Sequence, residues 1–258
     1  MRVPSLTLVA ASAVLLASTK PPPAVTPLGP SEEPAARQDG DVRAADPLGP
    51  SEEPAARQDG DVRAADLLAK VRDCTPVSRG RYRSDAGAPA AVPVCGLHGA
   101  VFWKADMDID CDGRPTARCN RRTDPQFYPA STYQQSDGGH LNAERLPYIV
   151  VPAASRVWNP RAHGVGGGSV AAVVYRDRVQ YAVVGDTGPR DLIGEASYAT
   201  ARRLGIPADP RRGGARSGVT YIVFKNARVS AIEDHAAAVA AGERLARQLV
   251  SGGTARGR

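Results

Sequence analysis

Apolar and polar residues follow strand-like patterns through the middle of the chain. Residues 99–110 read GAVFWKADMDID, which is apolar at first and then alternates, as a β-strand does. Shorter apolar runs predict strands at 148–153 and 218–224. The runs SVAAVVY and VQYAVVGD flank the triplet RDR and predict a hairpin. Because AAVVY and YAVV lack strict alternation, we expect these two strands to be covered on both faces.

Three segments have helical patterns. Residues 67–73 predict a short helix, and residues 193–205 predict a second helix that ends at Gly205. The alanine-rich segment 230–250 predicts a long closing helix with apolar positions at helical spacing: Ile232, Ala236, Val239, Leu245 and Leu249. The predicted fold is mainly β (α+β). We expect a single compact β-rich barrel- or sandwich-like domain with a short helix behind the loop at 186–189 and a long C-terminal helix.

The first 66 residues have a different composition. Residues 1–19 are typical of a secretory signal, with Arg2 ahead of an apolar run that is too short for a membrane span. The segment PLGPSEEPAARQDGDVRAAD occupies 27–46 and recurs unchanged at 47–66, so that residues 20–66 predict a disordered linker. The folded domain is expected at 67–250, with a flexible tail at 251–258. No later segment predicts a membrane span, and we therefore expect a secreted, extracellular protein.

The chain has four cysteines, at Cys74, Cys95, Cys111 and Cys119. After an export signal, an even number of cysteines favours disulfides, and the absence of a C-x-x-C pair weakens metal ligation further. Four cysteines allow three pairings. Locality favours Cys74–Cys95 with Cys111–Cys119, because both bonds close short loops.

Charge is distributed unevenly. The formal net charge is +6, while the two repeat units hold ten acids and four arginines, so that residues 67–258 carry about +10. A basic surface attracts nucleic-acid phosphates and repels polycations at long range. A metal-dependent secreted nuclease is therefore one hypothesis, with His140 of the DGGHLN segment between Asp137 and Asn142. A histidine flanked by glycine is more often a turn or capping residue, and the other histidines form no ligand spacing.

Two acids in YAVVGDTGPRDLIGEAS form a candidate catalytic pair. Asp186 ends an apolar strand, and Glu195 begins the expected helix, whose first turn favours negative charge. Both side chains could face one cleft, as the two carboxyl groups of a glycosidase must. The alternative is ordinary turn and capping chemistry, and the spacing alone does not decide between the two.

Alternating acids in ADMDIDCDG form a second motif. A strand would place Asp106, Asp108, Asp110 and Asp112 on one face, where like charges are costly without a cationic partner. The partner could be calcium or a polycationic substrate, and the alternative is a solvated acidic edge. An EF-hand is not expected, because the loop that begins at Asp108 has Cys119 where a glutamate is required.

Four motifs in the same order resemble the chitosanases of glycoside hydrolase family 75: ADMDIDCDG, VVYRDRVQYAVVGDTGP, IGEAS and GVTYIVF. The resemblance covers residues 67 to about 250. It implies a monomeric endo-chitosanase that hydrolyses the β-1,4 bonds of chitosan with inversion and needs no cofactor or metal. The essential aspartate and glutamate of the family fall on Asp186 and Glu195. We assign Glu195 as the general acid and Asp186 as the general base.

The same resemblance suggests substrate-binding residues. The alternating acids from Asp106 to Asp112 become a wall for glucosamine ammonium groups. Trp103, Tyr128 and Tyr175 are candidates for stacking on sugar rings, with core packing as the alternative for each. Nucleic acid and membrane are not expected partners under this hypothesis. The competing hypotheses are the nuclease and a non-catalytic cell-wall polysaccharide-binding protein.

Overall fold

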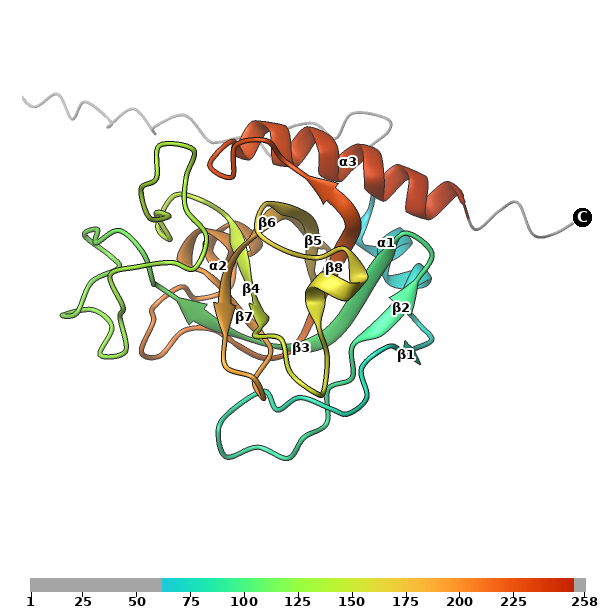
Figure 1. The fold of residues 1–258 in the computed structure, drawn as a ribbon, viewed down its shortest axis with the longest axis horizontal. Coiled ribbons are helices and arrows are strands. Elements are labelled where there is room, and N and C mark those ends of the chain that lie inside the picture. The colour runs from blue at the N-terminus through green and yellow to red at the C-terminus, as the bar shows by residue number, and fades with distance from the viewer. Residues whose placement is uncertain (1–61, 253–258) are drawn as a thin grey trace, which may run out of the picture. The chain divides into compact units, whose positions relative to one another are not determined.

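The computed structural model describes residues 62–252, and the predicted signal, repeats and most of the tail lie outside them. Figure 1 shows a β-barrel with helices packed around it. The elements in chain order are α1 (Ala64–Lys70), β1 (Thr75–Pro76), β2 (Cys95–Leu97), β3 (Ala100–Asp110), β4 (Tyr148–Pro152), the 3-10 helix η1 (Pro160–His163), β5 (Ser169–Tyr175), β6 (Arg178–Gly188), β7 (Glu195–Ser197), α2 (Tyr198–Leu204), β8 (Ala215–Arg228) and α3 (His235–Ser251).

Six strands close the barrel in the order β3-β7-β4-β6-β5-β8, and β8 pairs back onto β3. The pairs β3–β7 and β4–β6 are parallel, while the others are antiparallel. The prediction of a mainly β domain with a short helix and a long C-terminal helix is confirmed. Of the two architectures that the sequence left open, the structure has the barrel.

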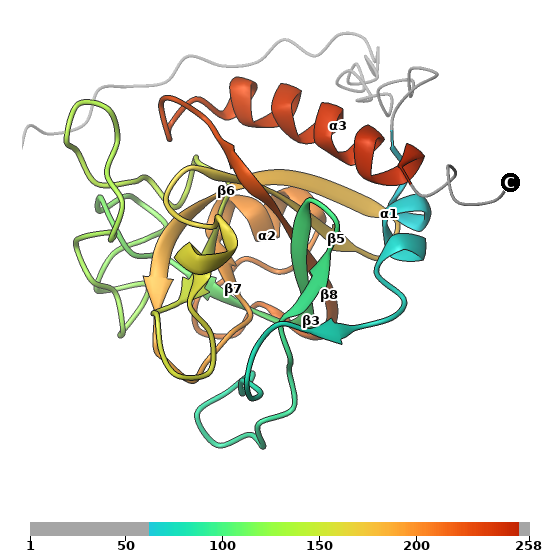
Figure 2. The ribbon, with the colours of Figure 1, turned by 45° about the vertical axis from the view of Figure 1, so that its right-hand side comes forward.

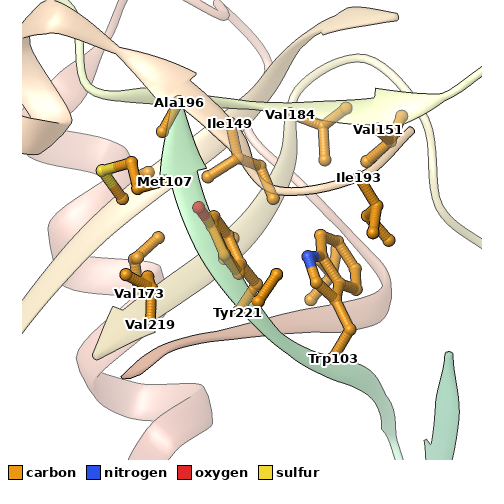
Figure 3. Close-up of a cluster of buried hydrophobic side chains, with 14 of the residues drawn as sticks. Trp103, Met107, Ile149, Val151, Val173, Val184, Ile193, Ala196, Val219 and Tyr221 are labelled. Carbon is orange, nitrogen blue, oxygen red and sulfur yellow. The ribbon is translucent and has the colours of Figure 1, made fainter. Parts of the chain in front are cut away.

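The barrel is filled by apolar side chains from all six strands, and Figure 3 shows part of this core. The ring of Trp103 stacks on the ring of Tyr221, with 5.3 Å between their centroids, and Trp158 packs edge-on against Trp103. Trp103 is fully buried. It therefore lies in the core, as the alternative interpretation had it, and is not available for stacking on a bound sugar.

Helices α1 and α3 cover the outside of the barrel (Figure 2). Helix α3 packs against β5 and β6 and against α1. Alternate residues of β5, Val170, Ala172 and Val174, face these helices, while Ala171 and Val173 face the barrel interior. The two hairpin strands are thus covered on both faces, as their unbroken apolar runs predicted.

Several element boundaries differ from the sequence prediction. The helix expected from residue 193 begins only at Tyr198, because the hydroxyl of Ser197 accepts the N-terminal cap bond from the Thr200 N–H. Gly205 ends this helix in the left-handed conformation, as predicted. Helix α1 begins at Ala64, three residues before the predicted start. The short strands β1 and β2 had no clear sequence pattern.

Two disulfides join Cys74 to Cys95 and Cys111 to Cys119, the pairing that locality favoured. The first bond ties the segment after α1 to β2. The second closes the loop that follows β3. Within residues 62–252, none of the helices combines the length and the apolar character needed to cross a membrane.

Replacing Trp103 with alanine tests its place in the core. We expect Trp103→Ala to lower the free energy of unfolding by about 3–5 kcal/mol, because it leaves a cavity among the barrel side chains. Tyr175→Phe is the control, since Tyr175 is only half-buried at the end of β5, and it should change stability by less than about 0.5 kcal/mol. Chemical denaturation measures both values, and equal stability of the two variants would contradict the assignment.

Candidate active site

One end of the barrel carries an acidic cleft of about 1010 Å³. It is bounded by the ends of β3, β6 and β7, by the segment 124–132 and by the loop at 210–213. Six carboxylate side chains and one guanidinium line it: Asp108, Asp110, Asp112, Asp124, Asp186, Glu195 and Arg211. The cleft is thus rich in carboxyl groups although the domain around it is basic.

Asp186 lies near the end of β6 and is 6% exposed. Its Oδ1 accepts hydrogen bonds from the Thr132 N–H at 2.9 Å and from the Thr187 N–H at 2.7 Å. Backbone donors of this kind hold a carboxylate in place. Both bonds use Oδ1, so neither of them occupies Oδ2.

Glu195 lies in β7 and not in the first turn of a helix, which corrects the sequence prediction. It is half-buried, and its register partner on the parallel strand β3 is Asp108. Gly194, directly before it, has a φ of +121°, and a Cβ there would lie 2.1 Å from the Asp106 Oδ1. Only glycine fits beside the Asp106 carboxyl group at this position. Pairing with β3 and β4 makes the residues that follow it a strand rather than a helix start.

Asp186 and Glu195 approach each other across β4. Strand β4 lies between β6 and β7, and Val150, the register partner of Asp186, also lines the cleft. A Cβ on Gly188 would lie 2.9 Å from the Glu195 Oε2 and 3.1 Å from the Val150 Cγ1. The Glu195 carboxyl group therefore reaches over Val150 to β6, two residues beyond Asp186. Positions two apart on a strand are separated by about 6.7 Å.

Three of the four alternating acids lie on one strand as the pattern predicted, and the fourth, Asp112, lies beyond its end. Asp106, Asp108 and Asp110 occupy alternate positions of β3, opposite in direction to the core residues Ala105 and Met107. Asp112 follows the strand, and its Oδ1 accepts from the Tyr128 N–H at 2.7 Å, while the Asp110 Oδ1 accepts from the Asp112 N–H at 2.7 Å. Asp108, Asp110 and Asp112 line the cleft, but Asp106 does not.

Burial and crowding raise the pKa values of these acids. Burial, followed by the charges of Asp108, Asp112 and Asp186, raises the pKa of Glu195 from 4.5 to about 7. Burial also raises the pKa of Asp112 to about 6 and that of Asp110 well above its usual range. Protons are therefore held in the cleft near neutral pH, and Glu195 is poised to donate one.

Other residues singled out from the sequence lie elsewhere. Tyr175 is half-buried at the end of β5, with the Arg176 guanidinium 5.0 Å from its ring centroid, and it does not line the cleft. The His140 Nδ1 accepts a hydrogen bond from the Ser131 N–H, which is the turn role expected of a glycine-flanked histidine. Tyr128 does line the cleft and is 62% exposed.

Three further cleft residues were not expected from the sequence. The backbone of Thr132 positions Asp186, Asp124 adds a buried carboxylate, and the Arg211 Nε donates to the carbonyl of Thr123 across the cleft at 2.9 Å. All three lie in irregular segments between the helices and strands, and they reach the cleft through contacts between parts of the chain that are distant in sequence. No periodicity or spacing in the sequence marks them.

A β-barrel whose acidic cleft holds two carboxyl groups on neighbouring parts of one sheet has the arrangement of a glycoside hydrolase. A family model described as fungal chitosanase of glycosyl hydrolase group 75 matches residues 107–250, and the chain belongs to this family. The match includes Asp186, Glu195 and the cleft acids of β3, and it begins after Asp106.

Named relatives agree with the family match. Endo-chitosanase C of Aspergillus oryzae is 33% identical over 131 residues, which are 49% of this chain and 32% of that protein. An endo-chitosanase of Aspergillus fumigatus is 30% identical over 141 residues, or 50% of this chain and 59% of its own length. A second Aspergillus oryzae endo-chitosanase is 33% identical over 131 residues, which are 46% of this chain and 54% of that protein. The chain thus spans between 32% and 59% of these relatives.

Gly188 gives a direct test of the position of Glu195. In Gly188→Ala, the new methyl group would displace the flexible carboxyl end of Glu195, which then moves toward solvent. We expect the pKa of Glu195 to fall from about 7 toward its ordinary value of 4.5, because burial is the main cause of the raised value.

Carbon-13 NMR titration of the glutamate carboxyl groups measures this change. Gly87→Ala is the matched control, since a Cβ at Gly87 meets nothing within 4 Å, and its titration curve should be that of the unaltered protein. An unchanged Glu195 titration in Gly188→Ala would show that the carboxyl group lies elsewhere.

Proposed function

We propose that this protein is a secreted endo-chitosanase that cleaves the β-1,4 bonds of chitosan by an inverting two-carboxylate mechanism. The observation that carries the proposal is the position of Asp186 and Glu195 in one acidic cleft, approaching each other across Val150. Family membership supports the substrate class, and three relatives are named endo-chitosanases.

The two environments support opposite roles for the two side chains. Glu195, with a pKa of about 7, is protonated in mildly acidic solution and acts as the general acid on the leaving oxygen. Asp186 has its Oδ1 held by two backbone N–H donors, and neither of these bonds uses Oδ2, so Asp186 acts as the base that takes a proton from water. After cleavage, Glu195 has lost its proton and Asp186 has gained one, and exchange with solvent resets the pair.

Inversion is the outcome that the family resemblance implies. The Glu195 carboxyl group lies beside Gly188, two residues along β6 from Asp186, so the two carboxyl groups reach the cleft from separate positions. Inverting glycosidases hold their carboxyl groups about 6.5–9.5 Å apart, so that a water molecule fits between the sugar and the base. Retaining enzymes need a separation of about 5–5.5 Å.

The cleft composition suits a cationic polysaccharide. Asp108, Asp110 and Asp112 form a row of carboxyl groups along one wall, and each can accept hydrogen bonds from a glucosamine ammonium group. The exposed ring of Tyr128 at the cleft is the best-placed aromatic surface for a sugar, and it replaces Trp103 and Tyr175 as the candidate for stacking. Two disulfides support an extracellular location.

Amide substitutions test the catalytic pair. Glu195→Gln cannot donate the proton and Asp186→Asn cannot accept it, so we expect each change to lower kcat at least about 10²–10⁴-fold with an unchanged circular-dichroism spectrum. Loss of viscosity of soluble chitosan measures cleavage, and ¹H NMR of the first-formed reducing ends measures inversion. Asp177→Asn, in the exposed β5–β6 turn, is the control and should cleave normally. Near-normal turnover of either amide variant would remove that residue from the mechanism.

The pH dependence tests the division of roles. Glu195 has a pKa raised from 4.5 to about 7, so its acid form is present below pH 7 and is lost as the pH rises through this value. We expect kcat on a soluble, partly acetylated oligosaccharide to fall about tenfold per pH unit above pH 7. A rate that stays constant to pH 9 would show that Glu195 is not the acid.

A further inference from the structure

Outside the catalytic pair, a second group of acids gathers where β3 meets the loop at 83–92. Asp85, Asp106 and Asp108 each bring a carboxylate oxygen to within 4.8 Å of the others. Asp85 and Asp108 are exposed, whereas Asp106 is 6% exposed. Asp85 and Asp106 do not line the cleft, so this group lies beside the candidate active site and shares only Asp108 with it.

The buried member of the group lacks a protein partner. Within the described residues, the Asp106 Oδ1 is buried and has no hydrogen-bond partner. The ion pairs of the described chain are Arg63–Asp66 and Arg247–Glu243, so no arginine or lysine in residues 62–252 neutralises the three acids. A buried, unpaired carboxyl oxygen beside two other carboxylates is costly unless a proton or a bound cation neutralises it.

The backbone around Asp106 supports this placement. The pairing of β3 with β8 is irregular between Ala105–Val219 and Met107–Ala215, and the extra residues lie on β8, so β3 stays regular at Asp106. The carbonyl of Asp106 accepts a hydrogen bond from the Tyr221 hydroxyl at 2.8 Å, and Gly194 leaves room for the Asp106 side chain.

Asp85 reaches the group from a loop that is anchored beside β7. The Arg83 N–H donates to the Asp191 carbonyl at 2.9 Å, and the Ile193 N–H donates to the Arg83 carbonyl at 3.0 Å. This loop therefore runs alongside the segment that leads into Glu195. Within the described residues, the side chain of Asp85 accepts no hydrogen bond, and its carboxylate is available to a ligand.

We infer that Asp85, Asp106 and Asp108 form a calcium site that fastens the loop at 83–92 to β3 beside Glu195. Calcium binds six to eight oxygens at about 2.3–2.6 Å, so two oxygens on one ion lie at most about 5 Å apart, and the oxygens of this group lie within 4.8 Å of one another. Calcium accepts flexible coordination by carboxylates, whereas magnesium demands near-ideal octahedral geometry and loses its waters reluctantly, so calcium is the ion that we infer. Water completes the calcium shell on the exposed side.

Calcium titration of the chelator-treated, full-length protein tests the inference without any sugar substrate. We expect calorimetry to show one Ca²⁺ per chain with a Kd of about 10⁻⁴–10⁻³ M, and Mg²⁺ to bind at least about tenfold more weakly. In about 10 mM CaCl₂, Tm should rise by about 3–10 °C.

Asp85→Asn should weaken Ca²⁺ binding at least about tenfold and abolish the rise in Tm. The fold should tolerate this change, because it removes no side-chain hydrogen bond. Asp177→Asn, another exposed aspartate, is the matched control and should bind Ca²⁺ normally.

Three outcomes would overturn the inference: no Ca²⁺ binding by the unaltered protein, equal binding of Mg²⁺, or Ca²⁺ binding that Asp85→Asn leaves unchanged. Weaker glucosamine-oligosaccharide binding by Asp85→Asn without any effect of Ca²⁺ would instead make the group a substrate site. Since the calcium measurements need no cleavage, they stand apart from the proposed chitosanase activity. If the protein cleaves chitosan but does not bind Ca²⁺, only this inference fails. If it binds Ca²⁺ but does not cleave chitosan, only the proposed function fails.

Discussion

The period-two alternation of β3 is the constraint on which the rest of the structure depends. One face of this strand carries Val101, Trp103, Ala105 and Met107 into the barrel core. The other face carries Asp106, Asp108 and Asp110 toward β7 and the cleft. Because side chains on a strand alternate strictly, burying the first set fixes the direction of the second. Packing of the barrel core thereby stabilises a concentration of like charges that would be unfavourable by itself.

That concentration resolves the apparent conflict between a basic domain and the proposed cationic substrate. Residues 67–258 carry about +10, yet six carboxyl groups and one arginine line the cleft. In physiological salt the Debye length is about 8 Å, which screens the distant surface charges from a polymer already in the cleft. The local charge therefore governs binding, while the overall charge affects mainly the approach of the polymer.

Much of the fold followed from the sequence, because it depends on local patterns. The hairpin of β5 and β6, the strands β3, β4 and β8 and the closing helix all come from runs whose apolar periodicity is clear. The position of Glu195 was misjudged for a physical reason. The motif IGEAS continues into a real helix, and only tertiary pairing with β3 and β4 makes its first part a strand.

The site itself was predictable only in part. Asp186 and the acids of β3 are marked by strand ends and alternation, and the family resemblance pointed to Asp186 and Glu195 together. Trp103 was a candidate from the sequence for stacking on a sugar ring, but its position on the inward face of β3 places it in the core. Thr132, Asp124 and Arg211 come from loops whose contacts form between distant segments, so a one-dimensional pattern does not contain them.

Strand β7 links these features, although it has only three residues. It pairs with β3 on one side and β4 on the other, and so places Glu195 between the acid row and the strand that separates it from Asp186. Both ends of β7 are held by specific contacts. Gly194, directly before the strand, packs against Asp106, and the hydroxyl of Ser197 caps α2 and donates a hydrogen bond to the carbonyl of Leu146 at 2.9 Å. Pairing on both sides fixes the backbone of Glu195 beside the acid row, where burial and the neighbouring carboxylates raise the pKa of its side chain to about 7. The barrel closure and the acid chemistry therefore depend on the same short pairing.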